Sequence, residues 1–285
     1  MLVGAIEAGG TKFVCAIGNE SNEIIERVSF PTTTPEETLA HVFEFFDQYE
    51  LASIGIGSFG PIDINEKSET YGYVLSTPKL AWKDFDFLGA MKERYDIPMG
   101  WTTDVNAAAL GESEKGAAAG LDNVMYITIG TGVGAGAIVN GQLLEGIGHP
   151  EMGHLLVKPH QDDHYDGFCP YHGNCLEGMA AGPSINGRLD MAGKDVDPDH
   201  QVWDFMANYI GQALVAYTVI LRPERIILGG GVMHAPKMLD KVKEAFDALL
   251  GNYVDVPELD SYLVKPGLGD NAGITGAILL ANQVK

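Results

Sequence analysis

Three glycine-rich turns stand out in the sequence, and each follows a short apolar run of the kind that forms a buried strand. The first is Gly9-Gly10-Thr11-Lys12, the second spans residues 130–136, and the third is Gly229-Gly230-Gly231. Glycine lets a backbone approach phosphate oxygens closely and present its N–H groups to them. A single turn of this kind also fits an ordinary hairpin. Their repetition favours a nucleotide-binding function.

The residues around the first turn add groups that suit a phosphate ester. Thr11 supplies a hydroxyl and Lys12 a cation. Glu7, just upstream, could hold Mg²⁺ directly or through water, because Mg²⁺ prefers oxygen ligands and keeps several waters. The turn is neither a Walker A loop, since GxxxxGK[ST] is absent, nor a Rossmann fingerprint, since a second strand rather than a helix follows it.

Asp104 lies where an apolar run ends and a series of strong helix formers begins, in Thr102-Thr103-Asp104-Val105-Asn106-Ala107. An aspartate at this position can cap the helix N-terminus. It can also accept the proton of an attacking alcohol, as carboxylates do in phosphoryl transfer. The sequence leaves both roles open.

A metal site is indicated by the spacing C-x2-H-x2-C in Cys169, His172 and Cys175, with His154 upstream as the fourth ligand. A closed Cys₂His₂ set is typical of structural zinc. The alternative is a pair of scattered thiols beside surface histidines. Two further histidines are alternatives for the fourth position: His160 and His164. Glu151 and Glu177 flank the cluster; they are not favoured as metal ligands and could hydrogen-bond sugar hydroxyls.

The periodicity of the chain predicts two similar α/β halves. In the first half we expect strands at residues 2–8, 13–18, 24–30 and 53–58, with a helix beginning at Pro35. In the second half we expect strands at 124–129, 137–140 and 225–228, a turn at 130–136, and helices at 201–221 and 237–250. A strand, a glycine turn, a returning strand, a helix and a strand ending in glycine recur in both halves, which indicates an internal duplication.

This duplication predicts two α/β domains that face each other across a cleft, where ligands usually bind. We expect the first domain to span residues 1–110 and the second, which carries the zinc loop, to span 111–271. The final segment, residues 272–285, has a helical pattern and is expected to return to the first domain.

Composition limits the classes of partner. The 285 residues include 39 acidic and 18 basic side chains, and the net charge is −21. Such a surface repels phosphate backbones and anionic lipids, so we expect neither nucleic acid nor membranes as partners. The chain has no apolar run of about 20 residues and no signal-peptide pattern at its start, so we expect a cytoplasmic protein. Its three cysteines do not suggest a disulfide framework.

Taken together, these motifs resemble those of the ROK sugar kinases, a family within the actin-like ATPase superfamily. The resemblance covers nearly the whole chain and rests on EAGGTK at 7–12, GSFGPID at 57–63, TDVNAAALGE at 103–112, ITIGTGVGAG at 127–136 and E-x-G-H at 151–154. The CPYH form of the cysteine loop is most similar to the bacterial zinc-containing ROK fructokinases.

The resemblance implies a duplicated actin-like (ribonuclease H-like) two-domain α/β ATPase fold with an interdomain cleft. It also implies phosphorylation of a hexose by ATP, with Mg²⁺ and a structural Zn²⁺ as cofactors and a homodimer as the assembly. Fructose is the expected hexose, converted to fructose 6-phosphate, with mannose or glucose as the alternatives.

The resemblance further implies roles for individual residues. Asp104 corresponds to the catalytic base. The sugar-side set is Gly60, Pro61, Thr103, Asp104, Glu151, His154 and Glu177, and the zinc set is His154, Cys169, His172 and Cys175. The nucleotide set is Gly9, Gly10, Thr11, Lys12, Gly130, Thr131, Gly132, Pro183 with its neighbour Gly182, Gly230, Gly231, Val232 and Met233.

Two residues depart from the pattern of the family. Glu7 stands where the first turn usually begins with Asp, which bears on how Mg²⁺ is held. Thr103 stands where the glucose enzymes often have Asn. This change removes an amide contact to the sugar and counts against glucose.

Three other functions fit parts of the sequence. A zinc hydrolase or deaminase would use the His/Cys cluster, although four protein ligands leave no open position for water. A non-catalytic sugar sensor would keep the fold without turnover, which the presence of Asp104 and all three turns counts against. Transcriptional repressors of the same family carry an N-terminal helix-turn-helix domain, and we expect none here because the first strand starts at residue 2.

Overall fold

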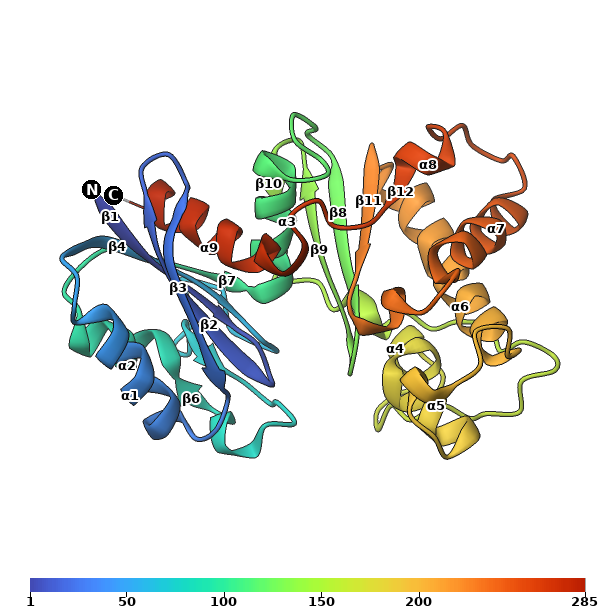
Figure 1. Ribbon diagram of the computed structural model, residues 1–285, viewed down its shortest axis with the longest axis horizontal. Coiled ribbons are helices and arrows are strands. Elements are labelled where there is room, and N and C mark those ends of the chain that lie inside the picture. Colours follow the sequence, from blue (N-terminus) through green and yellow to red (C-terminus); the bar gives the residue numbers. More distant parts are fainter. Residues whose placement is uncertain (285) are drawn as a thin grey trace. The chain divides into compact units, whose positions relative to one another are not determined.

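The computed structural model describes residues 1–284 and divides into two compact units (Figure 1). Unit 1 comprises Met1–Ala119, Leu143–Pro150 and the residues from Gly267 onward, and unit 2 comprises Gly120–Gln142 and Glu151–Pro266. The chain therefore passes repeatedly from one unit to the other, and the final helix belongs to unit 1.

Unit 1 is built on a five-stranded sheet in the order β3-β2-β1-β4-β7. Its strands are β1 (Leu2–Ala8), β2 (Lys12–Asn19), β3 (Ile24–Pro31), β4 (Leu51–Ser58) and β7 (Met99–Thr103). Its helices are α1 (Pro35–Phe46), α2 (Phe87–Arg94), α3 (Asp104–Lys115) and α9 (Ala272–Gln283). A short hairpin of β5 (Tyr73–Val74) and β6 (Phe85–Asp86), the 3₁₀ turn η1 (Leu80–Trp82) and the turn η5 (Gly269–Asn271) complete it.

Unit 2 has a second sheet, in the order β10-β9-β8-β11-β12. The strands are β8 (Val124–Ile129), β9 (Val133–Val139), β10 (Gln142–Leu143), β11 (Arg225–Gly229) and β12 (Leu263–Val264). The helices are α4 (Leu176–Ala180), α5 (Gly182–Leu189), α6 (Val202–Leu221), α7 (Met238–Leu250) and α8 (Leu259–Tyr262). Short 3₁₀ turns are η2 (Met152–His154), η3 (Gly193–Asp195) and η4 (Gly231–His234).

The strand pairing confirms the predicted duplication. In unit 1 the central strand β1 pairs antiparallel with β2 and parallel with β4. In unit 2 the central strand β8 pairs antiparallel with β9 and parallel with β11. The two sheet orders match position by position, so each unit is one copy of the same α/β arrangement.

The predicted bounds of the second glycine turn and of the strand predicted after it, at residues 137–140, are wrong. The turn expected over residues 130–136 ends at Gly132, because β9 already begins at Val133 and runs to Val139. Gly134 and Gly136 pair opposite Thr128 and Tyr126 of β8. Pairing with a buried neighbouring strand thus outweighs the low strand propensity of glycine. The strands expected at 2–8 and 124–129 have the observed bounds.

The sheet of unit 1 is covered on both faces. Because side chains alternate along a strand, Ile6 and Ala8 of β1 belong to one core cluster and Val3 and Ala5 to another. The first cluster is rich in aromatic rings, with Trp82 packed 5.3 Å from Phe13 between ring centroids. The second cluster is made with one face of α9, which lies across the sheet (Figure 1).

Helix α9 packs so closely against β4 and α3 that backbone atoms of these elements are in contact. A Cβ atom on Gly55 of β4 would lie 1.9 Å from the carbonyl oxygen of Ala277, and one on Gly276 would lie 1.6 Å from the carbonyl oxygen of Ala107 in α3. Gly111 of α3 meets the carbonyl oxygen of Ala272 in the same way, at 2.3 Å. Glycine is required at these positions because any side chain would force the helices and the sheet apart.

Glu112 in α3 is a fully buried carboxylate that accepts three backbone hydrogen bonds. The donors are the N–H groups of Ala117 at 2.6 Å, Gly267 at 2.9 Å and Leu268 at 2.9 Å. Ala117 lies just before the chain leaves unit 1 and Gly267 just after it returns. Within unit 1, the Glu112 side chain therefore holds both the segment where the chain leaves for unit 2 and the segment where it returns.

A search of the described residues finds no helix that is both long and apolar enough to cross a membrane.

The glycine packing gives a stability prediction. Gly276→Ala should lower the free energy of unfolding by about 2–4 kcal/mol, because the new methyl group meets a backbone carbonyl that cannot rotate away. Helix propensity alone would change stability by about 1 kcal/mol in the opposite direction. Urea unfolding followed by circular dichroism measures the difference.

Gly148→Ala is the control, because a Cβ atom at this glycine has no neighbour within 4 Å. It should stay within about 0.5 kcal/mol of the unsubstituted protein. Equal stability of the two variants would show that α3 and α9 are not packed at backbone distance.

Candidate functional site

The register of the parallel strands of unit 1 brings several of the predicted residues to one sheet edge. Ala8 pairs with Ser58, and Ser58 pairs with Thr103. Because parallel strands end at the same edge, the residues that follow these strands come together there. These residues are Gly9 of the first glycine turn, Phe59-Gly60-Pro61, and Asp104.

The first glycine turn is a tight reversal between β1 and β2. The N–H of Gly9 donates to the carbonyl oxygen of Lys12 at 3.0 Å, and a Cβ atom on Gly9 would lie 2.8 Å from that oxygen. Thr32, after β3, supports the turn by donating its hydroxyl to the Gly9 carbonyl oxygen at 2.6 Å. Thr11 and Lys12 are exposed at its tip, so their polar groups are available to a ligand.

Glu7, near the end of β1, is half-buried, and its Oε2 is inaccessible to solvent. Its carboxylate packs against Gly273, where an added Cβ atom would lie 2.6 Å from the Glu7 Cδ, and accepts a hydrogen bond from the N–H of Ile274. Burial raises the pKa of Glu7, and the positive charges of Arg27 and Lys12 oppose the rise. Oε2 of Glu7 has no hydrogen-bond partner among the described residues. A buried oxygen in this state suits a cation or a bound water.

The structure separates the two roles that the sequence left open for Asp104. The N-cap of α3 is Thr103, whose hydroxyl accepts a hydrogen bond from the N–H of Asn106 at 3.1 Å. Asp104 is the first helical residue, half-buried, and its Oδ1 accepts from the N–H of Val105 at 2.9 Å. The capping role that the sequence left open for Asp104 is therefore wrong. The lack of a side chain on Gly57 lets this helix start close to β4, where an added Cβ would lie 3.3 Å from the Asp104 Cα.

Gly60 and Pro61 begin the loop that follows β4. The next residue, Ile62, is buried and donates its N–H to Nε2 of His149 at 3.1 Å. Pro61 contributes its carbonyl oxygen, which accepts from the N–H of Leu75 at 2.8 Å. The loop is therefore held from two sides.

A corresponding sheet edge in unit 2 gathers the other glycine-rich segments. Thr128 pairs with Gly229, so the turn after β8 and the turn after β11 lie at the same edge. Gly230 has a positive φ of 89°, and a Cβ atom there would lie 2.4 Å from the backbone nitrogen of Ile129. The N–H of Gly182, at the start of α5, donates to the carbonyl oxygen of Gly130 at 2.7 Å.

Three predicted nucleotide segments thus meet within unit 2. They are the turn at 130–132, the N-terminus of α5 with Gly182 and Pro183, and η4 with Val232 and Met233. Val232 and Met233 are buried, whereas Thr131 and Gly231 are exposed. The arrangement gathers exposed backbone at Thr131 and Gly231 over buried apolar side chains at one corner of the sheet.

Glu177 joins this corner to the cysteine loop. It lies in the first turn of α4, and its Oε2 accepts a hydrogen bond from the N–H of Val133 at 3.0 Å. A Cβ atom on Gly132 would lie 2.7 Å from the same oxygen, so a larger residue there would displace the Glu177 carboxylate. Glu151, by contrast, is exposed and directly precedes η2, where its carbonyl oxygen accepts from the N–H of His154.

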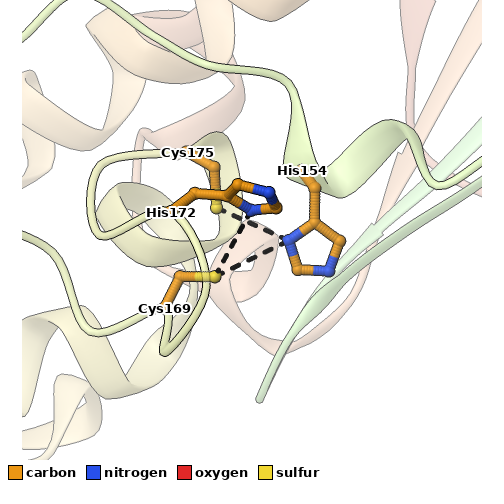
Figure 2. Close-up of side chains that lie close together, drawn as sticks. All are labelled: His154, Cys169, His172 and Cys175. Atoms are coloured by element: carbon orange, nitrogen blue, oxygen red, sulfur yellow. Dashed lines mark hydrogen bonds between the residues drawn. The ribbon is translucent and has the colours of Figure 1, made fainter. Parts of the chain in front are cut away.

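The four predicted metal ligands converge (Figure 2). Their donor atoms all lie within 4.8 Å of one another. Nδ1 of His154 is 3.7 Å from Sγ of Cys169 and 3.6 Å from Sγ of Cys175, and Nδ1 of His172 is 3.8 Å from Sγ of Cys169. Tetrahedral zinc with Zn–S of about 2.3 Å and Zn–N of about 2.0–2.1 Å requires S–N separations of roughly 3.6 Å. The donor set therefore fits Zn²⁺, and four such ligands would complete a tetrahedral site.

Local backbone geometry brings these ligands together. The N–H of Gly173 donates to the Cys169 carbonyl oxygen at 2.9 Å, which closes the loop between the two cysteines. The N–H of Leu176 donates to the Leu155 carbonyl oxygen at 2.8 Å, which brings η2 and its histidine to that loop. His160 and His164, the alternatives for the fourth position, are not in the group of converging donors.

A buried ion pair holds the segment between η2 and the cysteine loop against helices α5 and α6 of unit 2. Arg188 of α5 donates from Nη2 to Oδ2 of Asp163 at 2.7 Å, and Tyr209 of α6 donates its hydroxyl to the same oxygen at 2.7 Å. Burial works to raise the pKa of Asp163, but the hydrogen bonds from Arg188 and Tyr209 hold it below its ordinary value. The carboxylate therefore stays ionised and ties this segment to α5 and α6.

Sequence reasoning did not single out two residues that support these segments. His149 was visible inside Gly148-His149-Pro150-Glu151, but nothing in its spacing linked it to Ile62. Glu112 was visible as the last residue of TDVNAAALGE, but its three backbone donors come from segments that only the fold brings together.

Comparison with known proteins gives a consistent set of relatives. The chain is 50% identical over 281 residues to "Fructokinase" of Pediococcus pentosaceus, covering 99% of this chain and 98% of that protein. It is 48% identical over 289 residues to "Fructokinase" of Streptococcus mutans, covering 99% and 98%.

A solved structure has the same fold. It is a ROK family glucokinase from Streptomyces griseus in complex with glucose and AMPPNP, with a TM-score of 0.77 and 25% identity, covering 99% of this chain and 100% of that chain. The family model described as "ROK family" matches residues 3–284. With its duplicated α/β units, this chain belongs to the ROK family and has the actin-like ATPase fold.

Proposed function

We propose that this protein is an ATP-dependent fructokinase that converts D-fructose to fructose 6-phosphate. The observation that carries the proposal is the carboxylate of Asp104 at the sheet edge beside the first glycine turn, with helix capping left to Thr103. A carboxylate that is not used as a cap, at the edge where strand ends gather polar groups, is suited to accept a proton from a substrate hydroxyl.

The choice of substrates is supported by the relatives. Two proteins named fructokinase share 48–50% identity with nearly the whole chain. The structurally similar glucokinase binds glucose and AMPPNP, an analogue of ATP. These likenesses favour fructose as the acceptor and ATP as the donor.

In the proposed reaction, the 6-hydroxyl of fructose loses its proton to the Asp104 carboxylate. The alkoxide oxygen attacks the γ-phosphorus in line, and the bond to the β-phosphate oxygen breaks to release ADP. The turn from Gly9 to Lys12 would stabilise charge on the phosphoryl oxygens through the N–H of Gly10, the Thr11 hydroxyl and the Lys12 ammonium. Little covalent chemistry falls to the protein, so positioning supplies most of the rate enhancement.

The nucleotide is proposed to bind the corner of unit 2. Gly130, Thr131 and Gly132 would contact phosphate oxygens, and the segments Gly182-Pro183 and 230–233 would border the adenosine. The supporting observation is that these three segments lie together, with backbone groups of Gly130 and Gly182 hydrogen-bonded at 2.7 Å.

On the sugar side we assign Gly60, Pro61 and Thr103 of unit 1 and Glu151, His154 and Glu177 of unit 2. Carboxylates suit the hydroxyls of a hexose because they accept the hydrogen bonds that those hydroxyls donate, and an imidazole whose Nδ1 ligates zinc can donate from Nε2–H to a hydroxyl oxygen. Glu177 is linked to the glycine turn through the N–H of Val133, which would connect sugar recognition with phosphate binding.

Mg²⁺ would accompany ATP, with Glu7 as the protein oxygen nearest to it. The buried Glu7 Oε2, which has no partner among the described residues, supports this assignment. The ion would neutralise phosphate charge. The zinc set would hold the cysteine loop rigid, because four protein ligands fill a tetrahedral site and leave no position for a reacting water.

Asp104→Asn tests the catalytic base. Asparagine keeps the shape but cannot take the proton, so we expect kcat to fall by about 10²–10⁴-fold while the KM values for fructose and ATP stay within about threefold. A coupled assay of ADP release measures both constants. Asp96→Asn, an exposed aspartate just before the opposite end of β7, is the matched control and should keep full activity. Near-normal kcat in Asp104→Asn would remove Asp104 from this role.

Zinc is tested by the metal content of the purified protein. We expect one zinc per chain, lost in Cys169→Ser and kept in Cys15→Ala, whose cysteine is buried in the sheet of unit 1. Loss of the metal should lower the Tm by roughly 5–15 °C, because a structural site contributes folding free energy. A protein without zinc whose Tm does not change on chelation would contradict the assignment.

A further inference from the structure

We infer that His149 is a positioning residue for the sugar, which it serves by fixing the loop that begins with Gly60 and Pro61. The inference deepens the proposed function and rests on it. His149 belongs to Leu143–Pro150, the segment that returns to unit 1 between two stretches of unit 2. Through His149 this returning segment contacts the loop after β4.

The contact is a directed hydrogen bond on a buried residue. The N–H of Ile62 donates to Nε2 of His149 at 3.1 Å, and Ile62 is 3% exposed. The ring also lies against Gly60, where an added Cβ atom would be 3.5 Å from Cε1 of His149. Because a backbone N–H only donates, Nε2 must supply a lone pair, which places the proton of the neutral ring on Nδ1.

The opposite side of the loop is held by the β5 region. Ile62 forms an isolated bridge with Val74, and the Pro61 carbonyl oxygen accepts from the N–H of Leu75 at 2.8 Å. These contacts fix the loop on one side only. The bond to His149 supplies the other side, so Gly60 and Pro61 are held between a strand and an imidazole.

The returning segment has little buried surface of its own. Ile147 is fully exposed, and Glu145 and Gly146 are exposed as well. Partial burial of the Glu145 carboxyl and the negative charge of Glu66 raise the pKa of Glu145, and His149 opposes the rise. The bond between His149 and Ile62 ties this largely exposed segment to the loop after β4.

The position of His149 in the chain makes the bond relevant to the sugar. Only Pro150 separates it from Glu151, the proposed sugar ligand. One ring thus fixes Gly60 and Pro61 and also the start of the segment that leads to Glu151 and His154. Loss of the bond should weaken sugar binding selectively, because neither Asp104 nor the nucleotide corner depends on it.

Two amide variants that differ by one methylene test the inference. In His149→Gln, Oε1 can reach the position of Nε2 and accept from Ile62, whereas in His149→Asn the shorter side chain cannot. We expect His149→Asn to raise the KM for fructose about tenfold, with kcat and the KM for ATP within about twofold, and His149→Gln to restore the KM to within about threefold. Ile147→Ala, on the same segment, should match the unsubstituted protein.

Amide hydrogen exchange at Ile62, measured without sugar, gives a second readout. Exchange should be faster in His149→Asn than in His149→Gln or the unsubstituted protein. If the unsubstituted enzyme is active and both amide variants keep its KM for fructose, the inference is overturned. Equal exchange at Ile62 in all three proteins would also overturn it. Absence of fructose phosphorylation by the unsubstituted enzyme would instead refute the proposed function.

Discussion

The position of Asp104 depends on the packing of α9 and α3 against β4 at backbone distance. Gly55, Gly276 and Gly111 bring carbonyl oxygens of the neighbouring element to within 1.6–2.3 Å of where a Cβ atom would lie. Gly57 adds the close start of α3, beside Asp104. Such contacts prevent the helices and the strand from shifting, because backbone atoms cannot repack as side chains do. Gly276, in the last helix, thus helps to set the geometry of the Asp104 carboxylate.

In each unit, polar groups are carried by loops that individual side chains hold in place. Glu112 accepts from both ends of the excursion through unit 2, His149 holds the loop after β4, and Glu177 accepts from the N–H of Val133. Asp163 and Arg188 hold the segment before the cysteine loop. Each is a side chain that satisfies backbone or charged partners in another segment. Loops that bind ligands gain their rigidity from such contacts, because they have little core of their own.

Much of the fold was predictable because it follows from local patterns. The runs at 2–8 and 124–129 are continuous apolar strands, and the duplication could be seen from the glycine turns that follow them. The zinc set was predictable because Cys169, His172 and Cys175 are close in sequence. The start of β9 was not, since Gly134 and Gly136 become strand only by pairing with β8. The cap of α3 was left open because Thr103 and Asp104 are both good capping residues, and only backbone geometry selects Thr103.

Assays of ADP release over a panel of hexoses, with the product identified by NMR, test the central claim most directly. The account predicts that D-fructose with MgATP gives fructose 6-phosphate, with kcat/KM at least about tenfold above that for mannose or glucose, equivalent to about 1.4 kcal/mol of discrimination. Phosphorylation of glucose in preference to fructose would contradict the proposed substrate. Absence of ADP release with every hexose, from a folded protein that binds ATP, would contradict the proposed reaction itself.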